Sequence, residues 1–170
     1  MIEHRAFPLR PEPAVPAGFK GTYREEGWRR CGQMSAADGL TFTPWPHPTM
    51  PNWSLPALEA AKCVAKHGDE DLFERVHQAL FRAYFTESRN IADPAEVERV
   101  VAAEGADMAR FTADFRAGLG RDAVIADYEA AVTEHGVRSI PTVIFPESGR
   151  ALVGLVDFET YRAALEEAAG

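Results

Sequence analysis

Cysteine is scarce in this chain of 170 residues, because Cys31 and Cys63 are its only two cysteines and no Cys-x-x-Cys pair occurs. Two cysteines so far apart indicate neither a disulfide-rich secreted domain nor a cysteine-rich zinc site. The first residues, MIEHRAFPLRPEP, lack the basic stretch and apolar stretch of a secretory signal. We therefore expect a protein of the reducing cytoplasm.

Long apolar runs and a basic stripe are also missing. No apolar run approaches the roughly 20 residues that a transmembrane helix needs. Lysine and arginine number 18 against 26 acidic residues, for a net charge of −8, which argues against nucleic acid or an anionic membrane as a partner. The chain is 46% hydrophobic and 26% charged, which is typical of a globular domain.

Proline is unevenly distributed, since nine of the 12 prolines lie at or before Pro56. We interpret residues 2–9 as a short strand and residues 11–39 as irregular. Residues 42–54 alternate prolines with aromatic residues. This pattern predicts an extended loop, because the residue before each proline avoids the helical conformation.

From residue 54 onward the apolar residues follow the helical period. Asp93, Pro94 and Glu96 form the clearest start signal, with a capping carboxylate, a proline at the first helical position and a carboxylate at the third. We expect consecutive helices packed on one another over residues 54–136. Their predicted starts are Ser54, Asp69, Asp93, Asp107 and Asp122.

The periodicity changes in the C-terminal tail. Residues 142–145 are β-branched or aromatic, the turn sequence PESG follows, and residues 151–156 predict a second strand. Asp157 is placed to cap a last helix. The expected order is therefore a strand, a long helical region, an antiparallel hairpin and a helix.

The sharpest local motif is Ser139-Ile140-Pro141-Thr142, at the start of the first hairpin strand. Its simplest explanation is that a proline at a strand start needs no donor for the ladder. The surrounding order of elements also resembles the second half of a thioredoxin motif, in which this proline is cis. The backbone of Ile140 would then face outward, where an extended peptide or the cysteinyl part of glutathione can pair with it.

Four segments carry a wider resemblance: IEHRAFPLRPE, PNWSLPALEAA, LFRAYFTESRNIADPAEVERV and GVRSIPTVIF. The chain resembles the bacterial DsbA-family thioredoxin-fold proteins of the FrnE-like type. These are related to 2-hydroxychromene-2-carboxylate isomerases and kappa-class glutathione transferases. The resemblance implies an α/β, thioredoxin-like fold with an all-helical insertion. Residues 1–53 and 137–170 would form the thioredoxin-like part, and residues 54–136 the insertion.

One difference from these families limits which functional residues the resemblance can assign. In these families the segment resembling IEHRAFPLRP is preceded by a first strand, a Cys-x-x-Cys or single Ser/Cys site and a first helix. We expect this chain to lack them, and three explanations stay open: a misassigned start, a fragment of a longer protein, or a natural variant without the redox site. No catalytic residue is therefore assigned, and inactivity in dithiol–disulfide exchange is expected. Cys63 fits a small buried residue of a helix. Cys31 follows two arginines but has no resolving cysteine beside it, so a redox role there is the minority interpretation.

The candidate substrate-binding set combines Ser139, Ile140, Pro141 and Thr142 with Trp45 and Trp53. The two tryptophans allow two interpretations. Either they pack into the core, or they form an apolar wall for a substrate above the Ile140–Pro141 turn. The histidine spacing fits no ligand motif, so no metal is assigned.

The resemblance implies two functions, and a third of a different class is kept beside them. The first is a thiol–disulfide oxidoreductase-like protein that docks a thiol or disulfide peptide and needs no cofactor. The second is a kappa-type isomerase or transferase that uses glutathione, and the third is a non-catalytic peptide-binding or assembly module. Without a strand between them, residues 2–9 and 142–145 would expose unpaired backbone, so we also expect direct pairing or a homodimer.

Overall fold

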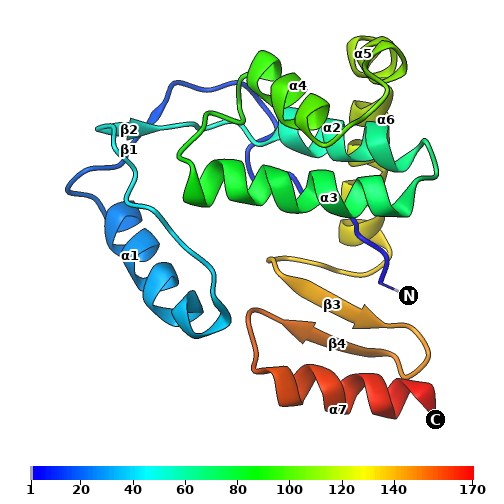
Figure 1. The fold of residues 1–170 in the computed structure, drawn as a ribbon. Helices are drawn as coiled ribbons and strands as arrows, with labels where there is room; N and C mark the ends of the chain where they lie inside the picture. Colours follow the sequence, from blue (N-terminus) through cyan, green and yellow to red (C-terminus); the bar gives the residue numbers. More distant parts are fainter. Residues whose placement is uncertain (1) are drawn as a thin grey trace. The chain divides into compact units, whose positions relative to one another are not determined.

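The computed structural model describes residues 2–170 and divides the chain into two compact units, Met1–Ala126 and Asp127–Gly170. Figure 1 shows the elements, which are described below within each unit separately. No helix among residues 2–170 combines the length and apolar character that crossing a membrane requires. In chain order the elements are β1 (Ala17–Gly18), α1 (Tyr23–Ser35), η1 (Ala36–Asp38), β2 (Thr49–Met50), α2 (Leu55–Ala65), α3 (Glu70–Phe81), the π-helical η2 (Arg82–Thr86), α4 (Pro94–Ala103), α5 (Met108–Arg116), α6 (Leu119–Thr133), β3 (Thr142–Phe145), β4 (Arg150–Val153) and α7 (Phe158–Ala169).

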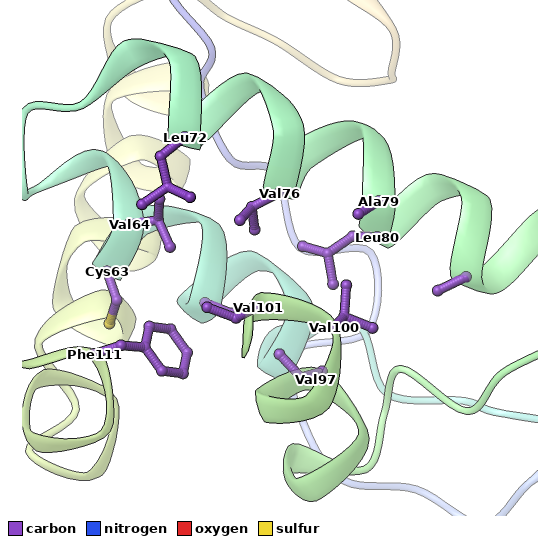
Figure 2. Close-up of a cluster of buried hydrophobic side chains, with 12 residues drawn as sticks. Cys63, Val64, Leu72, Val76, Ala79, Leu80, Val97, Val100, Val101 and Phe111 are labelled. Atoms are coloured by element: carbon purple, nitrogen blue, oxygen red, sulfur yellow. The ribbon is translucent and has the colours of Figure 1, made fainter. Parts of the chain in front are cut away.

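The core of the first unit lies between α2, α3, α4 and α5 (Figure 2). These helices pack together because each carries an apolar stripe at helical spacing, and burying that stripe is the main gain in folding. Figure 2 shows Cys63 of α2 beside Phe111 of α5. The predicted packing of consecutive helices is confirmed here, while the division of the chain at residues 53 and 137 stays a prediction.

Aspartates begin four of the helices as predicted. Each carboxylate accepts a hydrogen bond from a backbone N–H of the first turn, at 2.8–3.0 Å. These bonds satisfy N–H groups that have no partner inside the helix. The four caps are Asp69 of α3, Asp93 of α4, Asp107 of α5 and Asp157 of α7.

Two other helix starts differ from the prediction. The Ser54 side chain does not cap α2, because its Oγ accepts a hydrogen bond from Arg10 N at 3.0 Å and donates one to Arg10 O at 3.1 Å. Helix α6 begins at Leu119, three residues before the predicted Asp122. The reason is that the chain turns already at Gly118, whose φ is 75°.

The predicted strand over residues 2–9 is wrong. Residues 2–8 form no strand, and the two sheets among residues 2–170 pair only β1 with β2 and β3 with β4. The segment is instead held by individual contacts of its side chains and backbone. His4 O accepts a hydrogen bond from Lys62 Nζ at 3.2 Å, His4 Nε2 lies 3.2 Å from Glu74 Oε1, and Ala6 is buried.

The prediction that residues 11–39 are irregular is also wrong, because this segment contains α1. The Thr22 side chain accepts a hydrogen bond from the first turn of α1, and the Glu25 carboxylate accepts one from Gly21 N at 2.7 Å. The Thr-x-x-Glu pattern that starts many helices is present in the sequence, although Glu25 bonds to Gly21 N rather than to Thr22 N. Hydrophobic periodicity missed the helix because α1 buries only Trp28.

The second unit contains the β3–β4 hairpin and α7. The hairpin pairs Phe145 with Arg150, and Phe145 is buried together with Ala164 of α7. Arg150 also forms an ion pair with Glu167 of α7 at 2.7 Å. Helix α7 therefore covers the face of the hairpin that carries Phe145. The second strand ends at Val153 rather than at the predicted residue 156, because the chain turns at Gly154, whose φ is 82°.

The close approach of α6 to α2 yields a test of the packing. A Cβ on Gly120 would lie 2.2 Å from Glu59 O and 2.8 Å from Cys63 Sγ. Because backbone cannot yield cheaply, we predict that Gly120→Ala lowers the free energy of unfolding by about 2 kcal/mol or more, measured by urea denaturation.

Gly27→Ala in α1 is the matched control. A Cβ there meets nothing within 4 Å, and alanine favours a helix over glycine by about 0.5–1 kcal/mol. The control is expected to be neutral or stabilising. Similar effects of the two substitutions would contradict the packing described for α2 and α6.

Candidate docking edge

The turn from Ser139 to Thr142 leads into β3 in the second unit. Its Ile140–Pro141 peptide bond is cis. The Thr142 hydroxyl donates a hydrogen bond to Ser139 O at 2.7 Å, which closes the turn. Gly154 N donates to Pro141 O at 2.8 Å, so the turn is tied to the end of β4. Ile140 remains 44% exposed.

Among residues 2–170, β3 has a partner strand on one edge alone, which is β4. In an antiparallel pair, the residues that exchange hydrogen bonds alternate along each strand. The hydrogen bond from Gly154 N to Pro141 O fixes this alternation. The backbone N–H and C=O of Val143 therefore point towards β4, whereas those of Thr142 and Ile144 point away from it.

The turn extends this open edge. None of the hydrogen bonds found among residues 2–170 involves the backbone of Ile140. Ile140, Thr142 and Ile144 therefore form what we call the docking edge, a row of backbone donors and acceptors that an added strand can pair with. Ile140 and Thr142 belong to the candidate set drawn from the sequence, and Ile144 does not. The two-residue alternation of a strand places Ile144 on the same edge as Thr142.

The two thiols lie on helices of the first unit, and both are free. Cys63 of α2 is fully buried, as predicted. Burial raises the pKa of its thiol to about 11, although a hydrogen bond from the Gly120 backbone opposes this shift. Cys31 is exposed on α1 rather than in an irregular segment. The structure therefore combines a buried, protonated thiol with a separate exposed one.

The two tryptophans of the candidate set differ in their surroundings. Trp45 is 2% exposed and packs in a buried cluster with Phe19 and Trp28, and its Nε1 donates to Thr49 O at 2.8 Å. The burial of Trp45 agrees with the interpretation in which the aromatic residues of this loop pack into the core. Trp53 is half-buried, and its Nε1 donates to Pro11 O at 3.0 Å. A contact between Trp53 and substrate stays a prediction.

Other polar groups serve the packing of helices. His67 Nε2 lies 3.1 Å from Asp114 Oδ2 and Lys66 Nζ lies 3.3 Å from it, which ties the end of α2 to α5. The hydrogen bond with His67 lowers the pKa of Asp114. Within residues 2–170, no three His, Cys, Asp or Glu side chains are grouped so that they could hold a metal ion.

A hollow of about 550 Å³ lies beside α1 in the first unit. It was not anticipated, because α1 itself was not predicted. Its lining is mainly apolar and includes Phe19, Trp28, Leu40 and Phe42. None of the residues proposed from the sequence lines it, so it adds nothing to the docking edge.

Comparison with protein families matches residues 2–166 to the DSBA-like thioredoxin domain. The chain therefore belongs to the DSBA-like thioredoxin family, and the predicted family and fold class are confirmed. Among solved structures it is similar to the crystal structure of "a putative protein disulfide isomerase from Nitrosomonas europaea". The TM-score is 0.72 at 18% identity, over 92% of this chain and 76% of that chain. A search of curated proteins finds no match.

The unequal exposure of the cysteines predicts unequal reactivity. In the folded protein we expect iodoacetamide to modify Cys31 and leave Cys63 intact, because only a thiolate that the reagent can reach will react. With a pKa of about 11, Cys63 stays protonated even at mildly alkaline pH. Mass spectrometry of labelled peptides is expected to show one modified cysteine in buffer and two in urea. Two modified cysteines in buffer would contradict the burial of Cys63.

Proposed function

We propose that this chain binds an extended peptide containing a thiol or disulfide along the docking edge, as in the substrate-binding step of a DsbA-type oxidoreductase. The observation that carries this proposal is the unpaired backbone of Ile140, Thr142 and Ile144 along one side of β3. Membership in the DSBA-like thioredoxin family supports the choice of a thiol or disulfide as the substrate class.

Backbone pairing explains how such an edge accepts different peptides. Each N–H and C=O pair on the edge bonds to the backbone of the added strand, and this gives affinity whatever the peptide's side chains are. The exposed Ile140 side chain adds an apolar contact at one end. Because the edge is formed by only a few residues, the expected binding is weak and broad in sequence preference.

The cysteines of this chain do not complete an exchange cycle. In thiol–disulfide exchange, a thiolate attacks a disulfide sulfur and forms a mixed disulfide, which a second thiol must then cleave. Cys63 is buried and protonated, and Cys31 has no second cysteine three positions away, as a Cys-x-x-Cys pair would have. Attack by Cys31 would therefore end at the mixed disulfide. We propose binding without turnover by these two thiols.

Glutathione is a second candidate ligand for the same edge. Its cysteinyl residue carries one N–H and one C=O, which match the unpaired backbone groups of Ile140. This alternative corresponds to a kappa-type, glutathione-dependent activity. A peptide and glutathione differ in the length of edge they cover, so a single experiment separates them.

Hydrogen exchange followed by NMR tests the docking edge. Adding an excess of a linear peptide with an S-methylated cysteine is expected to slow exchange at the amides of Ile140, Thr142 and Ile144, because these donate to the added strand. S-methylglutathione is expected to slow Ile140 alone. The amide of Ala151, which points away from β3 on the outer side of β4, is the internal control. Slowing at Ala151 without slowing at Thr142 would show that the wrong edge was chosen.

Dithiol-driven reduction of insulin tests the expected lack of turnover. The wild type and a Cys31→Ser, Cys63→Ser double variant are expected to be equally inactive in the turbidity assay, since neither thiol has a resolving partner. Turnover by the wild type that disappears in the double variant would show that these cysteines catalyse the exchange.

A further inference from the structure

We infer that Thr142 is a positioning residue, whose hydroxyl holds the Ser139–Ile140 peptide unit so that the N–H of Ile140 faces a ligand. The role deepens the proposed function and rests on it, because a held N–H matters for binding only where a ligand accepts a hydrogen bond from it. It belongs to the turn before β3 and uses the side chain of Thr142 rather than its backbone.

The hydrogen bond from Thr142 Oγ1 to Ser139 O is local. It measures 2.7 Å and spans three residues. A peptide unit is planar, and in the trans form its C=O and N–H point in opposite directions. The cis bond found among residues 2–170 is Ile140–Pro141, so the Ser139–Ile140 unit is trans. Because Ser139 O is held at the Thr142 hydroxyl, the N–H of Ile140 points away from that hydroxyl.

The next peptide unit, which follows Pro141, is held independently of Thr142's side chain. Gly154 N donates a hydrogen bond to Pro141 O at 2.8 Å, and the proline ring fixes φ of Pro141. The Ser139–Ile140 unit lacks a ring and can turn about the backbone bonds on either side of it. Within residues 2–170, the bond from the Thr142 hydroxyl is the hydrogen bond found on this unit. One side chain therefore decides how the N–H of Ile140 is presented.

The fold of the hairpin does not need this hydroxyl. Ser139 and Ile140 are exposed, so water can replace the hydroxyl at Ser139 O and no buried group is left without a partner. Valine has the branched shape of threonine and is favourable in strands, so Thr142→Val keeps position 142 paired with Val153 of β4. The variant loses the fixed direction of one N–H.

The held N–H also sets the chemistry of the ligand group that meets it. An N–H needs an acceptor, which in an extended peptide or in glutathione is the C=O of the cysteinyl residue. If the peptide unit turned freely, only a fraction of the molecules would present the N–H, and the apparent affinity would fall by that fraction. A hydrogen bond typically shifts an equilibrium about two- to tenfold, so loss of the hydroxyl is expected to weaken binding within this range.

NMR titration with the S-methylated cysteine peptide measures the dissociation constants of the wild type and three variants. Thr142→Val is expected to raise the constant about two- to tenfold. Thr142→Ser keeps the donor and is expected to restore most of the affinity. Thr133→Val is the matched control, because it removes another 2.7 Å bond from a hydroxyl to a backbone carbonyl, that of Glu129 in α6. It is expected to bind like the wild type. S-methylglutathione is expected to give the same order of affinities, because it also bonds to Ile140.

Backbone relaxation of the ligand-free protein gives a readout that a change in overall stability does not move. The order parameter of the Ile140 amide is expected to fall in Thr142→Val and to recover in Thr142→Ser. The amide of Val143, which bonds within the hairpin, is expected to stay equally ordered in every variant. Circular dichroism checks that the variants are folded.

Four results would overturn the positioning role. The first is that Thr142→Val binds as tightly as the wild type. The second is that Thr142→Ser loses as much affinity as Thr142→Val, and the third is an equal loss in Thr133→Val. The fourth is weaker binding by Thr142→Val while Ile140 stays as ordered as in the wild type, which would mean that the hydroxyl contacts the ligand itself.

Failure of the proposed function has a different signature. A wild type that binds neither the S-methylated peptide nor S-methylglutathione overturns the proposed function. The order parameter of Ile140 in the ligand-free variants then decides the role of Thr142: loss of order in Thr142→Val supports it, and unchanged order overturns it.

Discussion

Helix α2 is the element on which the first unit depends, because neighbouring segments pack on it from several sides. Its side chains Ala60, Cys63 and Val64 are fully buried among those of α3, α4 and α5. The first turn of α6 approaches it closely enough that only a glycine fits at position 120. The carboxylate of Glu59 on α2 is buried and forms an ion pair with Arg121 of α6. The positive charge of Arg121 offsets the cost of removing this carboxylate from water.

The same helix helps to hold the N-terminal segment, which is not a strand. Residues 2–10 contact α2 through Lys62, through the burial of Ala6 next to Leu55, and through the two hydrogen bonds between Arg10 and Ser54. These contacts hold the segment without a strand on either side of it among residues 2–170. The segment is therefore packed without being a strand.

The geometry of the candidate site depends on the two-residue alternation of a β-strand rather than on helix packing. One hydrogen bond, from Gly154 N to Pro141 O, determines which residues of β3 pair within the hairpin and which face outward. The proposed docking edge and the thiols consequently lie on different elements. The edge consists of β3 and the turn before it, while Cys31 and Cys63 belong to α1 and α2.

The sequence by itself determined the features that depend on a few neighbouring residues. The caps at Asp69, Asp93, Asp107 and Asp157, the hairpin and the family could all be read from it, because capping and turn formation involve groups within about four residues. The Thr-x-x-Glu pattern at Thr22 was equally local and was overlooked because α1 has little apolar periodicity. Only the tertiary structure decided that residues 2–8 form no strand, that Trp45 is buried, and that the backbone of Thr142 and Ile144 points away from β4. Strand pairing and burial join segments far apart in the chain, and a local pattern contains no information about which distant segment will lie beside it.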